Sequence, residues 1–147
     1  SIVVDPSGFV IAGITTDNRT GATPQALELR NILISGGVAL IDQSFATLMQ
    51  VPVGEVWTVA DVQMRRDGSG YIVAASEVLN TANPMPQSAA FLVTAGGVVT
   101  SLSTTALPGG ELRAIADAGD RWIAGIAQSF FVFNVEVTSS PISPSPT

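Results

Sequence analysis

The chain has 147 residues, of which 46% are hydrophobic and only 12% charged, and its formal net charge at pH 7 is −6. This length suits one domain, which can bury a core without covalent cross-links. The chain contains no cysteine and no histidine, which excludes disulfides, thiolate or imidazole catalysis and nearly all zinc chemistry. No other cofactor is indicated.

The low charge is unusual, because a soluble globular protein has a charged fraction of about 25%. The longest apolar runs are far shorter than the roughly 18 residues of a membrane-spanning helix. We therefore expect a soluble protein that buries extra surface against partners, with no membrane association. The sequence does not start with a basic and then apolar leader, so we expect synthesis in the cytoplasm.

Nucleic acid is not an expected partner. A protein that holds a phosphate backbone needs a basic patch. All six basic residues are arginines. Only Arg65 and Arg66 are adjacent, and Asp67 follows them directly.

Residues 1–21 contain a short apolar piece (2–4), a turn (5–8), a strand pattern (9–15) and a polar loop (16–21). Two interpretations remain open for this segment. It is either an arm that reaches away from the body or a first edge strand followed by a loop.

Residues 24–31 also permit two interpretations. Thr23 before Pro24 is typical of a helix start. The alternation of Leu27 and Leu29 with charged neighbours is typical of a strand. We favour the strand, because two apolar runs follow on either side of Ser35-Gly36-Gly37, as in a β-hairpin.

The stretch Val51–Arg66 combines a turn with a long run rich in β-branched residues. Its alternation is broken, since Trp57 and Val59 fall on one face and Val62 and Met64 on the other. A β-bulge near Ala60-Asp61 explains this break, and so does burial on both faces.

The second half continues with short strands separated by turns that contain Gly or Pro. Strands are predicted at 71–75, 91–93, 98–100, 112–116, 122–126 and 131–137. Residues 80–87 are predicted to form a surface loop. The sequence predicts an all-β fold, specifically a single jelly-roll-like β-sandwich with extended N- and C-terminal segments, or else a small barrel. The expected divisions are residues 1–21, the sandwich over 22–138, and a Ser/Pro-rich, polyproline-like tail over 139–147.

Charged residues gather at two places. Asp61, Arg65, Arg66 and Asp67 could include an acid–base carboxylate pair, but surface ion pairs at a strand end explain them more simply. Asp117 and Asp120 flank Ala118-Gly119, and their spacing does not fit a calcium loop, so a hairpin turn is the better interpretation.

Other side chains give no catalytic site either. Hydroxyls stand beside glycine at Ser7, Ser35 and Ser69, but no histidine or lysine is available to activate them. Trp57 and Trp122 could stack on sugars, or they could anchor a core or an interface. We expect no enzyme activity and assign no catalytic, cofactor-binding or metal-binding residue.

Two motifs support a family resemblance: Pro-Val-Gly-Glu-Val-Trp-Thr-Val at 52–59, and Pro-Gly-Gly-Glu-Leu-Arg-Ala at 108–114 ahead of a closing strand. In these two motifs the chain resembles the head decoration (cement) proteins of tailed bacteriophages. The resemblance extends over about the last two-thirds of the chain. Tail-fibre and other virion β-modules contain motifs of the same kind.

The resemblance implies a jelly-roll module, often trimeric, on the outer surface of the virion capsid. There it would clamp neighbouring major capsid protein subunits. The alternative hypothesis is a receptor- or glycan-binding β-module of a tail fibre or a secreted enzyme. That alternative predicts an exposed Trp57 or Trp122 in a groove.

Overall fold

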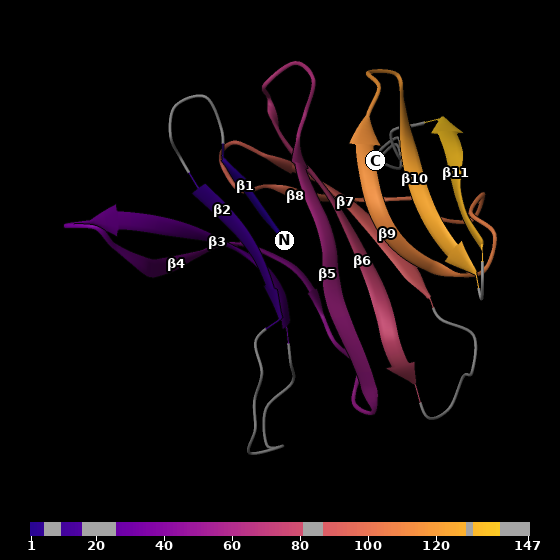
Figure 1. Ribbon diagram of the computed structural model, residues 1–147, viewed down its shortest axis with the longest axis horizontal. Coiled ribbons are helices and arrows are strands. Elements are labelled where there is room, and N and C mark those ends of the chain that lie inside the picture. Colours follow the sequence, from indigo (N-terminus) through magenta and orange to yellow (C-terminus); the bar gives the residue numbers. More distant parts are fainter. Residues whose placement is uncertain (5–9, 16–25, 81–86, 129–130, 139–147) are drawn as a thin grey trace, which may run out of the picture.

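The computed structural model describes residues 1–4, 10–15, 26–80, 87–128 and 131–138. This part of the chain is entirely β, which confirms the predicted class, and it has no helix that could cross a membrane (Figure 1). The strands are β1 (Ile2–Val4), β2 (Val10–Thr15), β3 (Ala26–Ser35), β4 (Val38–Gln50), β5 (Glu55–Met64), β6 (Gly70–Asn80), β7 (Ser88–Thr94), β8 (Val99–Leu102), β9 (Glu111–Asp117), β10 (Arg121–Gln128) and β11 (Phe131–Thr138).

The strands form three antiparallel sheets, with the orders β1-β2-β3-β4, β5-β6-β7-β8 and β11-β10-β9. Within the described residues, every pairing joins strands that are consecutive in the chain. A jelly roll has two sheets built from Greek keys, in which strands distant in sequence pair. The jelly-roll order is therefore not confirmed.

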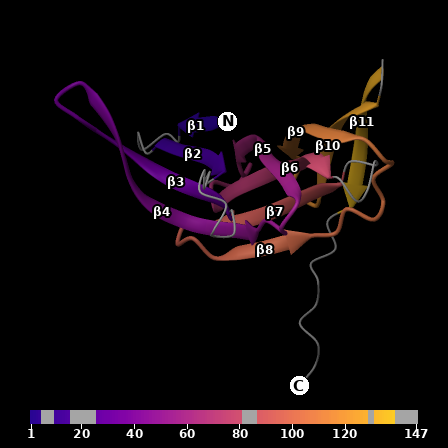
Figure 2. The same cartoon turned by 90° about the horizontal axis from the view of Figure 1, so that it is seen from below.

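The sheet β5–β8 lies between the other two (Figure 2). One of its faces packs against β2, β3 and β4 around buried residues that include Ile11, Leu29 and Trp57. Its other face packs against β9 and β10 around Leu112 and Trp122. Two cores therefore share one central sheet.

Strand β6 shows what this layering requires of a sequence. Every residue from Tyr71 to Glu77 is buried. Tyr71 and Val73 point into the first core, whereas Ile72 and Ala74 point into the second. A strand buried on both faces reads as a continuous apolar run, as 71–75 does, and not as an alternation.

Strand β5 contains the predicted bulge. Its register against β6 shifts between Val59 and Asp61. The extra residue moves the side chains that follow by one position. As a result Trp57, Val59 and Val62 all lie in the first core, with Met64 packed against it. The bulge interpretation is confirmed.

The segment 26–31 is a strand, as favoured above, and it belongs to the hairpin β3–β4. Gly36 and Gly37 form its turn with φ of 59° and 80°, values that glycine adopts without strain. In the first sheet β1 and β4 are the edge strands, and β2 lies between β1 and β3. The predicted loop at 16–21, residues 81–86 of the predicted loop at 80–87, and the tail over 139–147 lie outside the described residues, whereas Asn80 ends β6.

Candidate functional site

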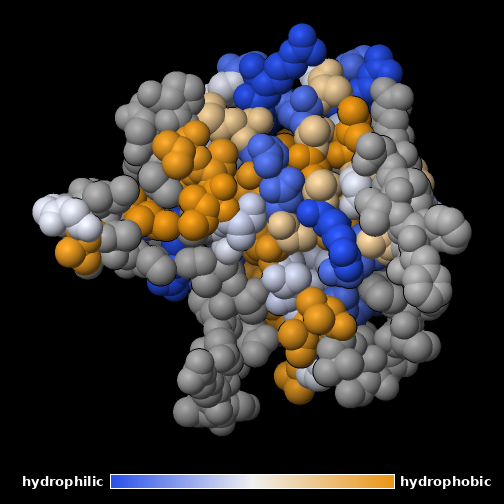
Figure 3. All heavy atoms as spheres, in the orientation of Figure 1, coloured by the Kyte–Doolittle hydropathy of each residue, from blue (hydrophilic) through white to orange (hydrophobic). Residues whose placement is uncertain are grey.

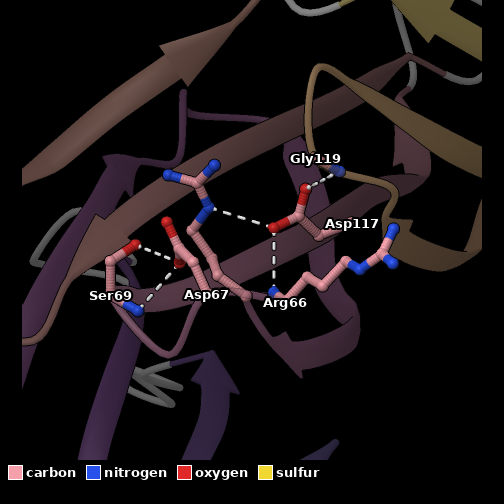
Figure 4. A network of polar contacts seen from close by, with 6 residues as sticks. Arg66, Asp67, Ser69, Asp117 and Gly119 are labelled. Atoms are coloured by element: carbon pink, nitrogen blue, oxygen red, sulfur yellow. Dashed lines mark hydrogen bonds and ion pairs between the residues drawn. The ribbon is translucent and has the colours of Figure 1, made fainter.

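A polar network joins the β5–β6 turn to the end of β9 (Figure 4). The Asp117 Oδ2 atom accepts hydrogen bonds from Arg65 Nε at 3.2 Å and from the Arg66 backbone N–H at 3.0 Å. Its Oδ1 atom accepts from the Gly119 backbone N–H at 3.0 Å. The network thus brings together residues that are about fifty positions apart in the chain.

These contacts hold Asp117 as a carboxylate. Burial alone would raise its pKa, but hydrogen bonds from Gly119, Arg66 and Arg65, together with the Arg65 charge, outweigh that effect and lower it. The pKa of Asp67 is also lowered, chiefly by the Ser69 hydroxyl, which donates across 2.6 Å, and then by the Ser69 backbone N–H. Neither carboxyl has the raised pKa expected of a general acid.

Asp61 does not join this network. It lies at the bulge of β5, where Oδ2 accepts from the Ile115 backbone N–H at 3.1 Å. Its Oδ1 accepts from Gln63 Nε2 at 3.0 Å and from Ser1 Oγ at 3.3 Å. Asp61 therefore links the first, central and third sheets, and the acid–base pair considered for this cluster is not assembled.

The other acidic candidate, Asp120, is exposed and pairs with the adjacent Arg121 at 3.3 Å. Across the described ranges no three acidic residues gather closely enough to hold a metal ion. Of the three hydroxyls considered, that of Ser69 is bonded to Asp67, and Ser7 lies outside the described residues. Ser35 stands at the hairpin turn.

Both tryptophans are buried. Trp57 is 5% exposed and its Nε1 donates to Glu55 Oε2 at 2.7 Å, while Trp122 is 2% exposed in the second core. A ring that stacks on a sugar must present a face to solvent. This finding argues against glycan stacking on either ring.

One buried acidic residue escaped the sequence analysis. Glu77 is 2% exposed on β6, opposite Trp57 on β5. Its Oε2 accepts from the Gln87 backbone N–H at 3.1 Å, but its Oε1 has no hydrogen-bond partner in the described part of the chain. The run of small and apolar residues before Glu77 indicates a buried strand. The position of Glu77 at the end of that run was therefore the sequence signal for its burial.

A shallow hollow of about 230 Å³ lies beside the start of β7. It is lined by Gln87, Ser88, Thr104, Leu107, Pro108, Gly109 and Gly110. The Ser88 hydroxyl donates to the Gly110 carbonyl and the Thr104 hydroxyl to the Ser88 carbonyl, each across 3.2 Å. With its hydroxyls engaged and no charged group in its lining, the hollow offers little chemistry.

The most distinctive surface feature is the end of the β3–β4 hairpin, residues 33–41, here called the distal ribbon. Figures 1 and 2 show it reaching away from the three stacked sheets. Strand β2 pairs with β3 only as far as Ile32. Beyond that point β3 and β4 pair with each other, with Leu33 opposite Leu40 and Ile34 opposite Ala39, and no other described strand pairs with them there.

Apolar side chains are also exposed on the body. Among the residues whose burial is described, the exposed large hydrophobic side chains of the body are Ile2, Val4, Val53, Val56, Val78, Val98 and Ile123, and Val38 is exposed on the distal ribbon. Val53 is 98% exposed. Figure 3 shows separate apolar areas on one face of the body and another at the tip of the distal ribbon. Exposed apolar areas larger than single side chains are typical of interaction sites.

Comparison with models of known families, with curated proteins and with solved structures gives no match.

Proposed function

We propose that this protein is a structural component of a bacteriophage virion that decorates the outside of the capsid and clamps neighbouring major capsid protein subunits. The observation that carries the proposal is the distal ribbon, an apolar hairpin that extends beyond the sheets. Such an arm gives a small molecule the reach to contact more than one neighbour. The exposed valines and isoleucines of the body supply further surface for burial.

The mechanism is binding linkage. A protein that binds only the assembled shell stabilises that shell by mass action, by about 2.7 kcal/mol when its free concentration is a hundred times Kd. Several modest contacts made by one oligomer, expected from the family resemblance to be a trimer, add through multivalency. The polar networks around Asp117 and Asp61 join the sheets to one another, which leaves the contacts with neighbours to apolar surface.

The charge distribution suits the outer surface. The chain carries a net charge of −6 and no lysine. An acidic protein is repelled by packaged DNA, whose phosphates need basic partners. The outside of the shell is therefore its expected location in the virion, after synthesis in the host cytoplasm.

The test is binding to shells assembled from the major capsid protein of the genome that encodes this chain. We expect the protein to co-sediment with the shells and to raise their melting temperature. The matched control is the exposed substitution Asp120→Asn, which should bind as the wild type does. A protein that neither sediments with the shells nor raises their melting temperature would overturn the proposal.

A further inference from the structure

We propose that Asp67-Gly68, in the β5–β6 turn, is a site of spontaneous backbone isomerisation and that Ser69 controls its rate. In this reaction the Gly68 backbone nitrogen gives up its proton and attacks Cγ of Asp67. Water leaves, and a cyclic imide forms. Water then opens the imide to aspartate or to isoaspartate, in which the main chain runs through Cγ. No other reactant is needed, and the inference does not rest on the virion role.

The first argument is the sequence and exposure of this turn. Asp67-Gly68 is the only place in the chain where glycine follows Asp or Asn. A side chain on the residue after the acid hinders the attack, and glycine has none. Both residues are exposed. A Cβ added at Gly68 would meet no atom within 4 Å beyond its chain neighbours, so packing does not shield this bond from solvent.

The second argument is how the turn holds the two reacting groups. Asp67 Oδ1 accepts hydrogen bonds from Ser69 Oγ at 2.6 Å and from the Ser69 backbone N–H at 2.9 Å. These contacts direct the carboxylate towards Ser69 (Figure 4). The Gly68 N–H donates to the Arg65 carbonyl at 2.9 Å, which holds the proton that the reaction must remove. Each reacting group is therefore bonded to a residue other than its reaction partner.

The charge of Asp67 acts in the same direction. A carboxylate repels an anionic nucleophile and is a poorer electrophile than the neutral acid. The Ser69 hydroxyl and then the Ser69 backbone N–H lower the pKa of Asp67. The contacts that orient the side chain therefore also keep it in its less reactive form. Ser69 is thus a positioning residue for both effects.

Isomerisation at Asp67 has a consequence outside the turn, because the two preceding residues contact Asp117. Isoaspartate adds one carbon to the main chain directly after Arg66. The Arg66 N–H and Arg65 Nε both donate to Asp117 Oδ2, at 3.0 and 3.2 Å. A longer main chain displaces these donors from their shared acceptor. The isoaspartate form, separated by chromatography, should therefore melt at a lower temperature than the unmodified protein, and an equal melting temperature would contradict this consequence.

The first experiment incubates the folded protein at neutral pH in water labelled with heavy oxygen. Each opening of the imide adds one heavy oxygen atom, which peptide mapping by mass spectrometry locates. We expect slow incorporation at Asp67 in the wild type. Ser69→Ala should raise that rate roughly two- to tenfold, the range that corresponds to the loss of one hydrogen bond. Ser69→Thr, which keeps a hydroxyl, should stay near the wild-type rate.

Two controls separate the role of Ser69 from general effects. Ser101→Ala, which removes an exposed hydroxyl from β8, should leave the rate at Asp67 unchanged. A peptide with the sequence of residues 62–73, which lacks the folded turn, should react faster than the folded protein. Equal rates in wild type and Ser69→Ala, or in the protein and the peptide, would refute control by Ser69. Faster incorporation at another acidic residue would refute the assignment of the site.

Discussion

Arg65 and Asp117 meet across 3.2 Å, although 52 positions separate them, and so join the β5–β6 turn to the end of β9. Asp117 is only 5% exposed at its side chain. It accepts three hydrogen bonds, two of them from backbone N–H groups. This contact ties the central sheet to the third sheet at their rim.

We expect Asp117→Ala to lower the free energy of unfolding by about 1–2 kcal/mol, because it leaves two backbone donors and one guanidinium without their acceptor. Urea denaturation monitored by tryptophan fluorescence measures the change. The control is Asp120→Ala, which removes an exposed pair with Arg121 and should change stability by no more than a few tenths of a kcal/mol. Equal effects of the two substitutions would show that the network is not structural.

The same carboxyl predicts a dependence on pH. Its folded-state pKa is below the usual value of about 3.9 for Asp. A lowered pKa means that the stabilisation is fully present above the unfolded-state pKa and is lost as pH falls through the folded-state pKa. The stability difference between wild type and Asp117→Asn should therefore be constant between about pH 7 and pH 5 and shrink below about pH 4. A difference that grew on acidification would contradict this assignment.

A third prediction concerns the closest approach of the first two sheets. Gly13 of β2 packs directly on β5, and a Cβ there would meet Val59 Cγ1 and lie 3.0 Å from Val62 Cγ2. We expect Gly13→Val to lower the free energy of unfolding by about 1–3 kcal/mol through overpacking. The double variant Gly13→Val with Val59→Ala should recover part of the loss, as a double-mutant cycle would measure. Absence of coupling would show that the two positions do not compete for space.

The bulge gives a fourth prediction. Asp61→Ala removes the acceptor of the Ile115 N–H, and we expect a loss of about 1–2 kcal/mol in the free energy of unfolding. Gln63→Ala removes only an exposed neighbour of the same carboxylate and should be nearly neutral. Thermal melts of the two variants would distinguish these effects. If Asp61→Ala left the stability unchanged, Asp61 would not be a structural link between the sheets.

Glu77 gives a fifth prediction. Gln at this position keeps an oxygen for the Gln87 N–H and removes an acidic group that is buried with one oxygen unpaired. Since an incompletely paired buried acid is costly, we expect Glu77→Gln to raise the melting temperature. Glu77→Ala, which loses the Gln87 contact, should lower it. A fall with both substitutions would show that the acidic group itself stabilises the fold.

The sequence pattern predicted the strands well, because each is bounded by glycine, proline or a polar turn. The bulge was one of two explanations for the switch of faces between Val59 and Val62, and the register shift in β5 decides for it. The layering could not be predicted in the same way. The run 71–75 indicates a strand buried on both faces, but nothing local says which strands cover it.

The candidate sites show the same limit. Asp61 and Arg65 are close in sequence, yet they bond to different partners on β9, because a strand extends about 3.3 Å per residue. The real partner of Arg65 is Asp117, which the sequence placed in an unrelated turn. The distal ribbon was predicted as a hairpin, but the sequence did not show that the described part of β2 pairs with β3 only as far as Ile32.

The pairing of consecutive strands alone has a consequence for how the chain folds. Within the described residues each sheet is built from consecutive strands, so its hydrogen-bonded ladders can form without a strand from another sheet. During synthesis β1–β4 emerges first, β5–β8 next and β9–β11 last. Each sheet can therefore assemble as a unit before the next one docks on it. The first sheet then exposes its apolar face until the central sheet arrives, and this interval is when the nascent chain is most prone to aggregate.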